Sequence, residues 1–345
     1  MTIPSQYTTF VAVGIGGSAL LGVILNMVIL ATLLHTKDPI FNNGFYVVVG
    51  HMTVADGLLL LTYVIVAAPL VAFQRKLLSG VLEFWLANVD SITYNVLVVL
   101  LIIITLNRFV SIIGSFTNIQ RFAISKLFTV EKWLRAPLLF AWLWGIACAV
   151  GLAFGADCFK HFYFTEGNFG YNCSDYSDNN KVWAGYLLWH YLFEIFVFGL
   201  YIIIFLALKC QRQKARGDKQ LTDAEVAREK QRAKTERRML FQAALVTGFH
   251  LLNNVAFFHF SSFSHWMGSV LIAVAGIVNS MSNPIIYWVF NPPMRRETRK
   301  LLAAAFPCLK ISVTNSVSSY APSGARPTPA TRYTAKSDAQ ADSKV

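Results

Sequence analysis

Apolar residues fill long runs of this chain, and charged residues gather in the short segments between them. A helix needs about 20 apolar residues to cross a hydrocarbon core of roughly 30 Å. Seven runs reach that length, at 9–34, 44–73, 84–113, 134–155, 182–208, 238–260 and 267–290. Because a backbone in lipid must satisfy its own hydrogen bonds, each run is expected to be a helix. The pattern predicts an all-α protein, a bundle of seven transmembrane helices.

Composition agrees with a membrane protein. Of the 345 residues, 55% are hydrophobic and 14% are charged, whereas soluble domains carry about 25% charged residues. The net charge of +12 comes from basic residues in separate short segments, not from one continuous face. Such a distribution indicates membrane topology and argues against nucleic acid as a partner. The short alternating strands of a transmembrane β-barrel are not seen. Membrane lipid is the expected surrounding.

Orientation follows from the basic residues, which mark the cytoplasmic side of a membrane protein. The segments that share a side with the N-terminus hold only Arg75, Lys76, Lys160 and Lys181. The opposite side holds many more, among them the runs within 209–238 and 295–300. We therefore expect a multi-pass plasma-membrane protein with its N-terminus extracellular and its C-terminus cytoplasmic.

The chain divides into three parts on this interpretation. Residues 1–8 form an extracellular N-terminus, and residues 9–306 form the seven-helix domain, with an extracellular loop at 156–181 and a cytoplasmic loop at 209–237. Strong helix formers within that cytoplasmic loop predict an extension of the sixth helix. Residues 307–345 are rich in Ser, Thr, Pro and Ala and are expected to be a disordered cytoplasmic tail.

A short segment directly after the last span has a different pattern. NPPMRRETRKLLAAAF combines a basic face with Leu301, Leu302 and Phe306. This is typical of an amphipathic helix that lies in the membrane interface. Cys308 follows it and is a candidate for palmitoylation, with an unmodified cysteine as the alternative.

Polar side chains inside the spans are costly and each calls for an explanation. Among them are Asn26, Asp56, Asn279, Ser280, Ser282 and Asn283. All fall in the middle or the cytoplasmic half of their helices, so they are predicted to meet in one buried cluster. The alternative is hydrogen bonding between helices, worth about 1 kcal/mol for each bond. That alternative is weaker for Asp56, whose carboxylate must be paired, hydrated, ion-bound or protonated.

Two further signals lie near the cytoplasmic ends of spans. Asn283-Pro284-x-x-Tyr287 places a proline kink beside polar side chains, which is a plausible conformational switch. Arg108 lies near the end of the third span, where a basic residue alone would only mark topology.

Together these residues resemble the rhodopsin-like family of G-protein-coupled receptors over about residues 9–306. The resemblance rests on Asn26, Asp56, Arg108, a tryptophan in the fourth span (Trp142 or Trp144) and Asn283-Pro284-x-x-Tyr287. It implies an extracellular ligand among the outer halves of the helices and a heterotrimeric G protein at the inner face. Arg108, Asn283, Pro284 and Tyr287 would be activation switches, and Asp56 with Asn279 and Ser280 would hold a sodium ion.

The chain also departs from that family. Asn107 stands where the family has an acidic residue, the third span lacks its outer cysteine, and the sixth span has no proline. A bond between Cys158 and Cys173 within the extracellular loop is expected to replace the missing bridge, since the exterior is oxidising. These features are similar to the nematode Srx-type serpentine chemoreceptors, which implies that the ligand is a small chemical cue.

Candidate ligand contacts are aromatic and polar residues in the outer halves of the spans. They are Tyr94, Trp183, His190, Glu194, Asn254 and His259, with Trp189 and Asn253 beside them. Ordinary packing is the alternative for each. Glu194 lies in an apolar stretch and needs a partner, and His190 is one turn away. In the outer loop, Asn172-Cys173-Ser174 matches the glycosylation pattern at Asn172, although the cysteine crowds it.

Other functions are disfavoured to different degrees. The chain has no glycine-rich phosphate loop, metal-binding histidine pair or nucleophile elbow, so we expect no enzyme activity and no cofactor. Residues 267–290 contain no lysine for a retinal Schiff base. A receptor for a neuropeptide or a small transmitter would show the same architecture. A membrane transporter, and a seven-helix protein that does not signal because of Asn107, also remain alternatives.

Overall fold

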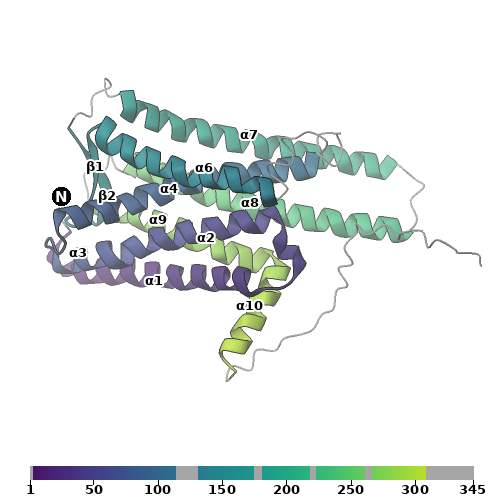
Figure 1. Ribbon diagram of the computed structural model, residues 1–345, viewed down its shortest axis with the longest axis horizontal. Helices are drawn as coiled ribbons and strands as arrows, with labels where there is room; N and C mark the ends of the chain where they lie inside the picture. The colour runs from purple at the N-terminus through teal and green to yellow at the C-terminus, as the bar shows by residue number, and fades with distance from the viewer. Residues whose placement is uncertain (1–2, 114–130, 175–180, 218–222, 261–265, 308–345) are drawn as a thin grey trace, which may run out of the picture. The chain divides into compact units, whose positions relative to one another are not determined.

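The computed structural model describes residues 3–113, 131–174, 181–217, 223–260 and 266–307. Among them are seven helical spans long and apolar enough to cross a membrane, which confirms the predicted fold class. Their helices are α1 (Ser5–His35), α2 (Gly44–Thr62) with η2 (Tyr63–Ala67) and α3 (Ala68–Phe73), α4 (Gly80–Ile113), α6 (Glu131–Val150) with η4 (Gly151–Gly155), α7 (Lys181–Gly217), α8 (Asp223–Phe260) and α9 (Trp266–Phe290). The helices lie side by side along their lengths (Figure 1).

The span on α4 is the central one. In its most apolar stretch 72% of the residues are buried, against 28% for α1 and 22% for α7. Large apolar side chains on those outer helices point away from the protein, for example Phe10 and Ile195, which are 78% and 68% exposed. In a membrane such side chains face lipid at no cost. Residues on α4 are therefore best placed to contact several helices at once.

Contact between α4 and α6 is close because α6 carries a glycine at the crossing. A Cβ atom added to Gly145 would lie 2.6 Å from the carbonyl oxygen of Ile92 and 2.7 Å from Cγ2 of Val96. Small residues let helix backbones approach one another in membranes, where dispersion contacts replace the hydrophobic effect. Gly145 thus fixes the distance between these two helices.

The second span has a π-helical turn, η2, before Pro69 begins its last segment. Proline lacks a backbone N–H, and single π turns are a common way to accommodate such an interruption. Tyr63 is the first residue of this turn and is buried. The turn therefore lies at the level where the second span contributes to the site described below.

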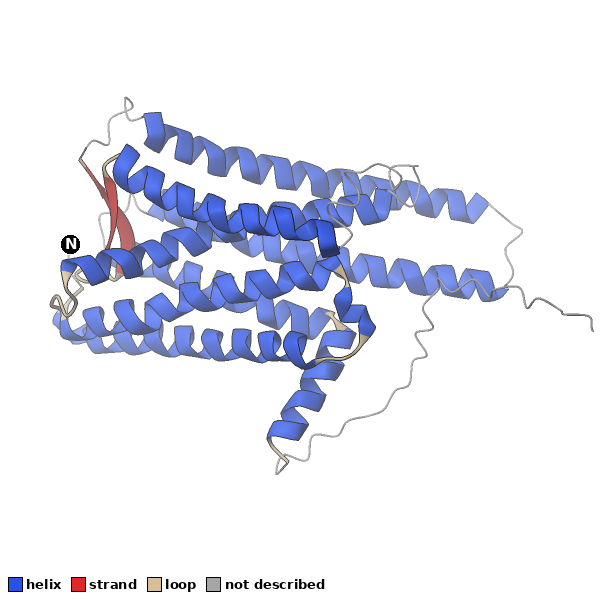
Figure 2. Cartoon of the chain, in the orientation of Figure 1, coloured by secondary structure: helices blue, strands red, loops and turns tan. Residues whose placement is uncertain are grey.

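A two-stranded antiparallel hairpin, β1 (Cys158–Tyr163) and β2 (Asn168–Cys173), covers one end of the bundle (Figure 2). Residues that alternate along each strand are buried, as expected when one face of a hairpin packs on a core. The cross-strand pairs on the buried face are Cys158 with Cys173, Lys160 with Tyr171, and Phe162 with Phe169. The first of these pairs is a disulfide.

The turn of the hairpin is anchored by segments from two other parts of the chain. The backbone N–H of Ile3 donates to the carbonyl of Thr165 at 2.7 Å. Gln74 at the end of α3 donates to the carbonyl of Phe164 at 3.1 Å. These bonds fix the turn against the N-terminus and the second span.

At the other end of the bundle lies α10 (Pro292–Ala305), the predicted short helix after the last span (Figure 1). Its N-cap, Asn291, accepts from the backbone N–H of Met294 and donates to the hydroxyl of Tyr46 on α2. Thr298 shares a hydrogen bond with Thr32 of α1. Arg296 forms an ion pair at 2.5 Å with Asp38, which caps the 3₁₀ turn η1 (Pro39–Asn42).

The boundaries differ from the sequence prediction in two loops. The segment 156–181, predicted only as a loop, contains the hairpin. Most of the predicted loop 209–237 is helical, since α7 extends to Gly217 and α8 begins at Asp223. The extension of α8 agrees with its strong helix formers. The predicted tail beyond residue 307, including Cys308, lies outside the described residues.

Replacing Gly145 by alanine is expected to destabilise the bundle by about 1–3 kcal/mol, the usual cost of overpacking. The measurement is the thermal unfolding of the purified protein in detergent. Gly17→Ala on α1 is the matched control, because a Cβ atom there meets nothing within 4 Å. Equal melting temperatures for the two variants would contradict the close packing at Gly145.

Candidate functional site

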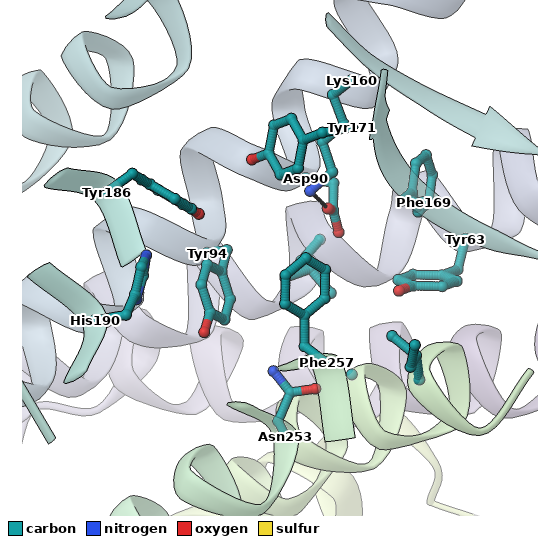
Figure 3. A pocket seen from close by; sticks show the side chains of 13 residues that line it. Tyr63, Asp90, Tyr94, Lys160, Phe169, Tyr171, Tyr186, His190, Asn253 and Phe257 are labelled. Atoms are coloured by element: carbon teal, nitrogen blue, oxygen red, sulfur yellow. Dashed lines mark hydrogen bonds and ion pairs between the residues drawn. The ribbon is translucent and has the colours of Figure 1, made fainter. Parts of the chain in front are cut away.

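A cavity lies beneath the hairpin, among the helices (Figure 3). The space open to the centres of water molecules is about 60 Å³, enough for several waters or a small organic group. The cavity is lined by Leu59, Tyr63, Asp90, Tyr94, Lys160, Phe169, Tyr171, Tyr186, His190, Asn253, Phe257, Ile272 and Gly276. Aromatic rings with a few convergent polar groups are typical of small-molecule sites.

A buried ion pair forms the side of the cavity next to the hairpin. The ammonium group of Lys160 on β1 donates to a carboxylate oxygen of Asp90 on α4. Both residues are only 6% exposed, and Lys160 also lies 5.1 Å from the centre of the Tyr171 ring. Figure 3 shows the pair above the cavity, with Tyr171 beside it. Two charges this deeply buried are stable only while they compensate each other.

The environment of Lys160 keeps it charged. Burial alone would lower the pKa of Lys160, but Asp90 and the hydroxyl of Tyr171 raise the pKa above its ordinary value. A lysine whose pKa is raised on folding stabilises the folded state below its ordinary pKa, and this contribution is lost only as the pH rises through the raised value. Lys160 therefore carries its charge at neutral pH.

Tyr171 on β2 is a second link between the hairpin and α4. Its hydroxyl shares a hydrogen bond of 2.7 Å with Ser91, the residue after Asp90. Its ring packs edge-on against Trp183 and Tyr186 of α7, with ring centres 5.6 and 6.2 Å apart. The hairpin is thus held to the third span by non-covalent contacts alone, because its disulfide joins the two strands to each other.

Tyr94 lies deeper in the cavity, between histidines from two helices. Its ring centre is 5.3 Å from His190 on α7 and 5.4 Å from His250 on α8. Neither ring nitrogen of His190 has a hydrogen-bond partner among the described residues. Nε2 of His250 has none there either. A neutral imidazole carries one donor and one acceptor, so His190 has unused hydrogen-bonding capacity beside the cavity.

Some of the predicted ligand contacts line the cavity, and others lie away from it. Tyr94, His190 and Asn253 line the cavity, whereas Trp183 packs behind Tyr171 and Tyr186. The expectation that Glu194 pairs with His190 is wrong. Glu194 instead accepts a hydrogen bond from Asn254 on α8, because that amide lies across the helix interface, and neither residue lines the cavity. The side chain of His259 lies outside the described residues.

Sequence reasoning missed the ion pair, although a signal for half of it was present. Asp90 is a carboxylate within the third span and, like Asp56, needs a partner at membrane depth. The sequence indicates Lys160 only as a basic loop residue on the same side of the membrane as the N-terminus. Its insertion depends on the hairpin register, which pairs it with Tyr171 on the buried face. The stretch of β2, NFGYNC, alternates between polar or small residues and larger apolar ones, but the stretch of β1 that carries Lys160, CFKHFY, does not.

The polar residues within the spans form a separate cluster. Asn283 on α9 donates to Oδ2 of Asp56 at 2.7 Å. Asn26 on α1 donates to the carbonyl of Ser280 at 3.3 Å, and Ser282 donates to the carbonyl of Asn279. Oδ1 of Asn26 and Oδ1 of Asn283 have no partner among the described residues, and the hydroxyl of Ser280 is a hydrogen-bond partner of the Asp56 carboxyl. These are hard oxygen donors around one carboxylate.

Arg108 and Tyr287 are linked through an aromatic ring of α2. The guanidinium of Arg108 lies over the ring of Phe45, 3.9 Å from its centre. The ring of Tyr287 meets Phe45 edge-on at 6.5 Å, and its hydroxyl contacts Sδ of Met52 at 3.6 Å. The two predicted switch residues therefore share a neighbour that the sequence did not identify.

The tryptophans of the fourth span have different contacts. Trp142 donates from Nε1 to Nδ1 of His51 on α2 at 3.1 Å. Trp144 packs on Phe140 and Trp189. Of the two candidates for the motif residue, Trp142 is thus the one that joins the fourth span to the second.

Comparison with known proteins gives one family and one fold. A family model described as "Serpentine type 7TM GPCR chemoreceptor Srx" matches residues 18–291. No curated protein matches the sequence significantly. Among solved structures, a crystal structure of squid rhodopsin is similar, with a TM-score of 0.74 and 15% sequence identity over 89% of each chain. At that identity the structural likeness establishes the fold alone.

Removing one partner of the buried ion pair is expected to destabilise the protein by about 3–5 kcal/mol, since the other charge is left uncompensated. Asp90→Ala and Lys160→Ala should therefore both lower the melting temperature of the purified protein at neutral pH. The double variant Asp90→Leu/Lys160→Met removes both charges and should recover most of the loss. If each single variant melts like the unmodified protein, the two groups do not form a buried pair.

Proposed function

We propose, from the premise that the chain belongs to the Srx family of serpentine G-protein-coupled chemoreceptors, that it binds a small chemical cue in the cavity under the hairpin. Binding would lead to activation of a heterotrimeric G protein at the opposite end of the bundle. The observation that carries the proposal is the cavity itself, which combines aromatic rings with an ion pair and with a histidine that has unused hydrogen-bonding capacity.

The hairpin end is proposed to be extracellular, in the plasma membrane. Two observations support this orientation. The basic residues of the connecting segments are concentrated toward the other side, and disulfides such as Cys158–Cys173 persist in oxidising surroundings. In this orientation the cavity lies in the outer part of the bundle, on the side from which an external cue arrives.

The small size of the cavity supports a small cue over a neuropeptide. About 60 Å³ for water centres accommodates a small organic group, and the hairpin covers the space from the outer side. A peptide would need a cavity open to the exterior over several residues.

The G protein would bind near Arg108, which is 8% exposed. Arg108 rests on Phe45, and Phe45 contacts Tyr287 near the Pro284 kink. A shift of α9 near Pro284 would change the contact of Tyr287 with Phe45 and so the position of Arg108. A cation on an aromatic face is held by about 2 kcal/mol or more when desolvated, so the contact with Phe45 contributes to where the guanidinium of Arg108 rests.

A sodium ion bound at Asp56, which the family resemblance implies, fits the donor set. Sodium prefers oxygen ligands, as other hard cations do, and the side-chain oxygens of Asn26, Asp56, Ser280 and Asn283 are of that kind. These residues would hold the ion between α1, α2 and α9. The ion would compensate the carboxylate of Asp56.

The test of coupling is G-protein activation in membranes that contain the expressed protein, with a broad extract of small chemicals as stimulus. Arg108→Ala should abolish activation at equal surface expression. Arg135→Ala is the matched control, because Arg135 is an exposed arginine near the start of α6, and it should retain activation. Silence of the unmodified protein, or full activity of Arg108→Ala, would contradict the proposed coupling.

Orientation is tested by glycosylation at Asn172, which is exposed on β2. If the hairpin enters the secretory lumen, the protein from eukaryotic cells should shift in gel mobility after treatment with a glycosidase. Asn172→Gln should remove this shift. Labelling of intact cells through a tag at the N-terminus provides an independent check, and a tag accessible only after permeabilisation would reverse the orientation.

A further inference from the structure

We infer that the cavity takes a small zwitterion, a molecule with one ammonium and one carboxylate group, which exchanges partners with the ion pair of Lys160 and Asp90. In the bound state the ligand ammonium would contact Asp90 and the ligand carboxylate would contact Lys160. The inference rests on the proposed function, because it names the class of ligand for the same cavity.

The first argument is the balance of charge. Lys160 and Asp90 are both 6% exposed and are each other's charged partner. A ligand with a single positive charge could pair with Asp90 only by leaving the ammonium of Lys160 uncompensated. A ligand with a single negative charge could pair with Lys160 only by leaving the carboxylate of Asp90 uncompensated. An uncompensated buried charge is strongly destabilising. A zwitterion is the simplest charged ligand that leaves every charge paired.

The second argument is the chemistry of the remaining walls. Tyr63 and Tyr94 offer hydroxyl groups that donate and accept hydrogen bonds, and His190 offers ring nitrogens without partners among the described residues. Phe169 and Phe257 add apolar surface. Such walls suit a compact molecule that has an aromatic or apolar group next to its charged groups.

The third argument is that the ion pair can open. The hairpin is attached to α4 through the ion pair, through the hydrogen bond between Tyr171 and Ser91, and through a ring contact of 5.9 Å between Phe159 and Phe84. All of these contacts are non-covalent, and the disulfide lies within the hairpin. Its turn is anchored separately, by Ile3 and Gln74. Strand β1 can therefore move away from α4 by the exchange of non-covalent contacts, which makes room for a ligand larger than the present cavity.

Opening of the pair also gives the ligand a route to the rest of the protein. Asp90 and Arg108 lie on the same helix, α4 (Gly80–Ile113). When a ligand takes the place of Lys160, Asp90 on α4 loses its contact with the hairpin lysine and gains a contact with the ligand. The change in contacts is therefore made directly on the helix that carries Arg108.

The experiment measures binding of three matched probes to the full-length protein in lipid nanodiscs. The probes are phenylalanine, phenethylamine, which lacks the carboxylate, and 3-phenylpropanoate, which lacks the ammonium group. The unmodified protein should bind phenylalanine about tenfold or more tightly than either of the other two. Binding is measured by thermal shift and confirmed by competition with radiolabelled phenylalanine.

Single-charge variants should change this selectivity in opposite directions. Lys160→Gln leaves Asp90 without its lysine and should bind phenethylamine best, whereas Asp90→Asn leaves Lys160 and should bind 3-phenylpropanoate best. The double variant Asp90→Asn/Lys160→Gln keeps the cavity neutral and should lose the preference for phenylalanine. Lys181→Gln, at an exposed lysine at the start of α7 outside the cavity, should bind all three probes as the unmodified protein does.

Three outcomes would overturn the inference. The first is equal binding of all three probes by the unmodified protein, and the second is unchanged selectivity in both single-charge variants. The third is that no probe binds to the unmodified protein or to any variant, although these proteins still unfold cooperatively. Because the Arg108→Ala comparison uses a chemical extract and a G-protein readout, coupling can be established while these probes fail. Conversely, charge-dependent binding in nanodiscs without G-protein activation would retain the zwitterion site and reject the coupling.

Discussion

The need to compensate two buried charges determines how the hairpin end of this protein is built. Lys160 reaches Asp90 only if β1 and β2 keep their register, because a shift by one residue would turn Lys160 to the opposite face. With this register, Tyr171 meets Ser91, and Phe162 and Phe169 pack into the core. The hairpin, the third span and the cavity between them thus form a single arrangement centred on one ion pair.

The fold was predictable from the sequence because the membrane imposes a simple rule on length and composition. A span must be long, apolar and helical, and the apolar spans of the structure coincide with the predicted runs within a few residues. The motif around Asn283 and Pro284 likewise stood out, since polar groups are rare at membrane depth. The end of α7 and the beginning of α8 were harder to predict. Both lie in charged segments outside the membrane, where this rule on length and composition does not apply.

The site was only partly predictable, for a physical reason. Tyr94 and His190 lie on helices, where spacing along the sequence indicates which side chains are at the same depth. Lys160, Tyr171 and Phe169 reach the cavity from a loop, whose register is set by tertiary contacts. Glu194 shows the same limit, because its partner Asn254 lies on another helix. Pairing across elements cannot be derived from local sequence alone.

The placement of the disulfide within the hairpin has a consequence for how such a receptor can diversify. The bond keeps the two strands in register, so the face toward the cavity is presented by a small cross-linked unit that is covalently independent of the third span. Substitutions at positions 169 or 171, which line the cavity from β2, would alter that face while leaving the buried ion pair in place. Recognition and helix packing could then vary separately during evolution, and a change of ligand would not require a new bundle.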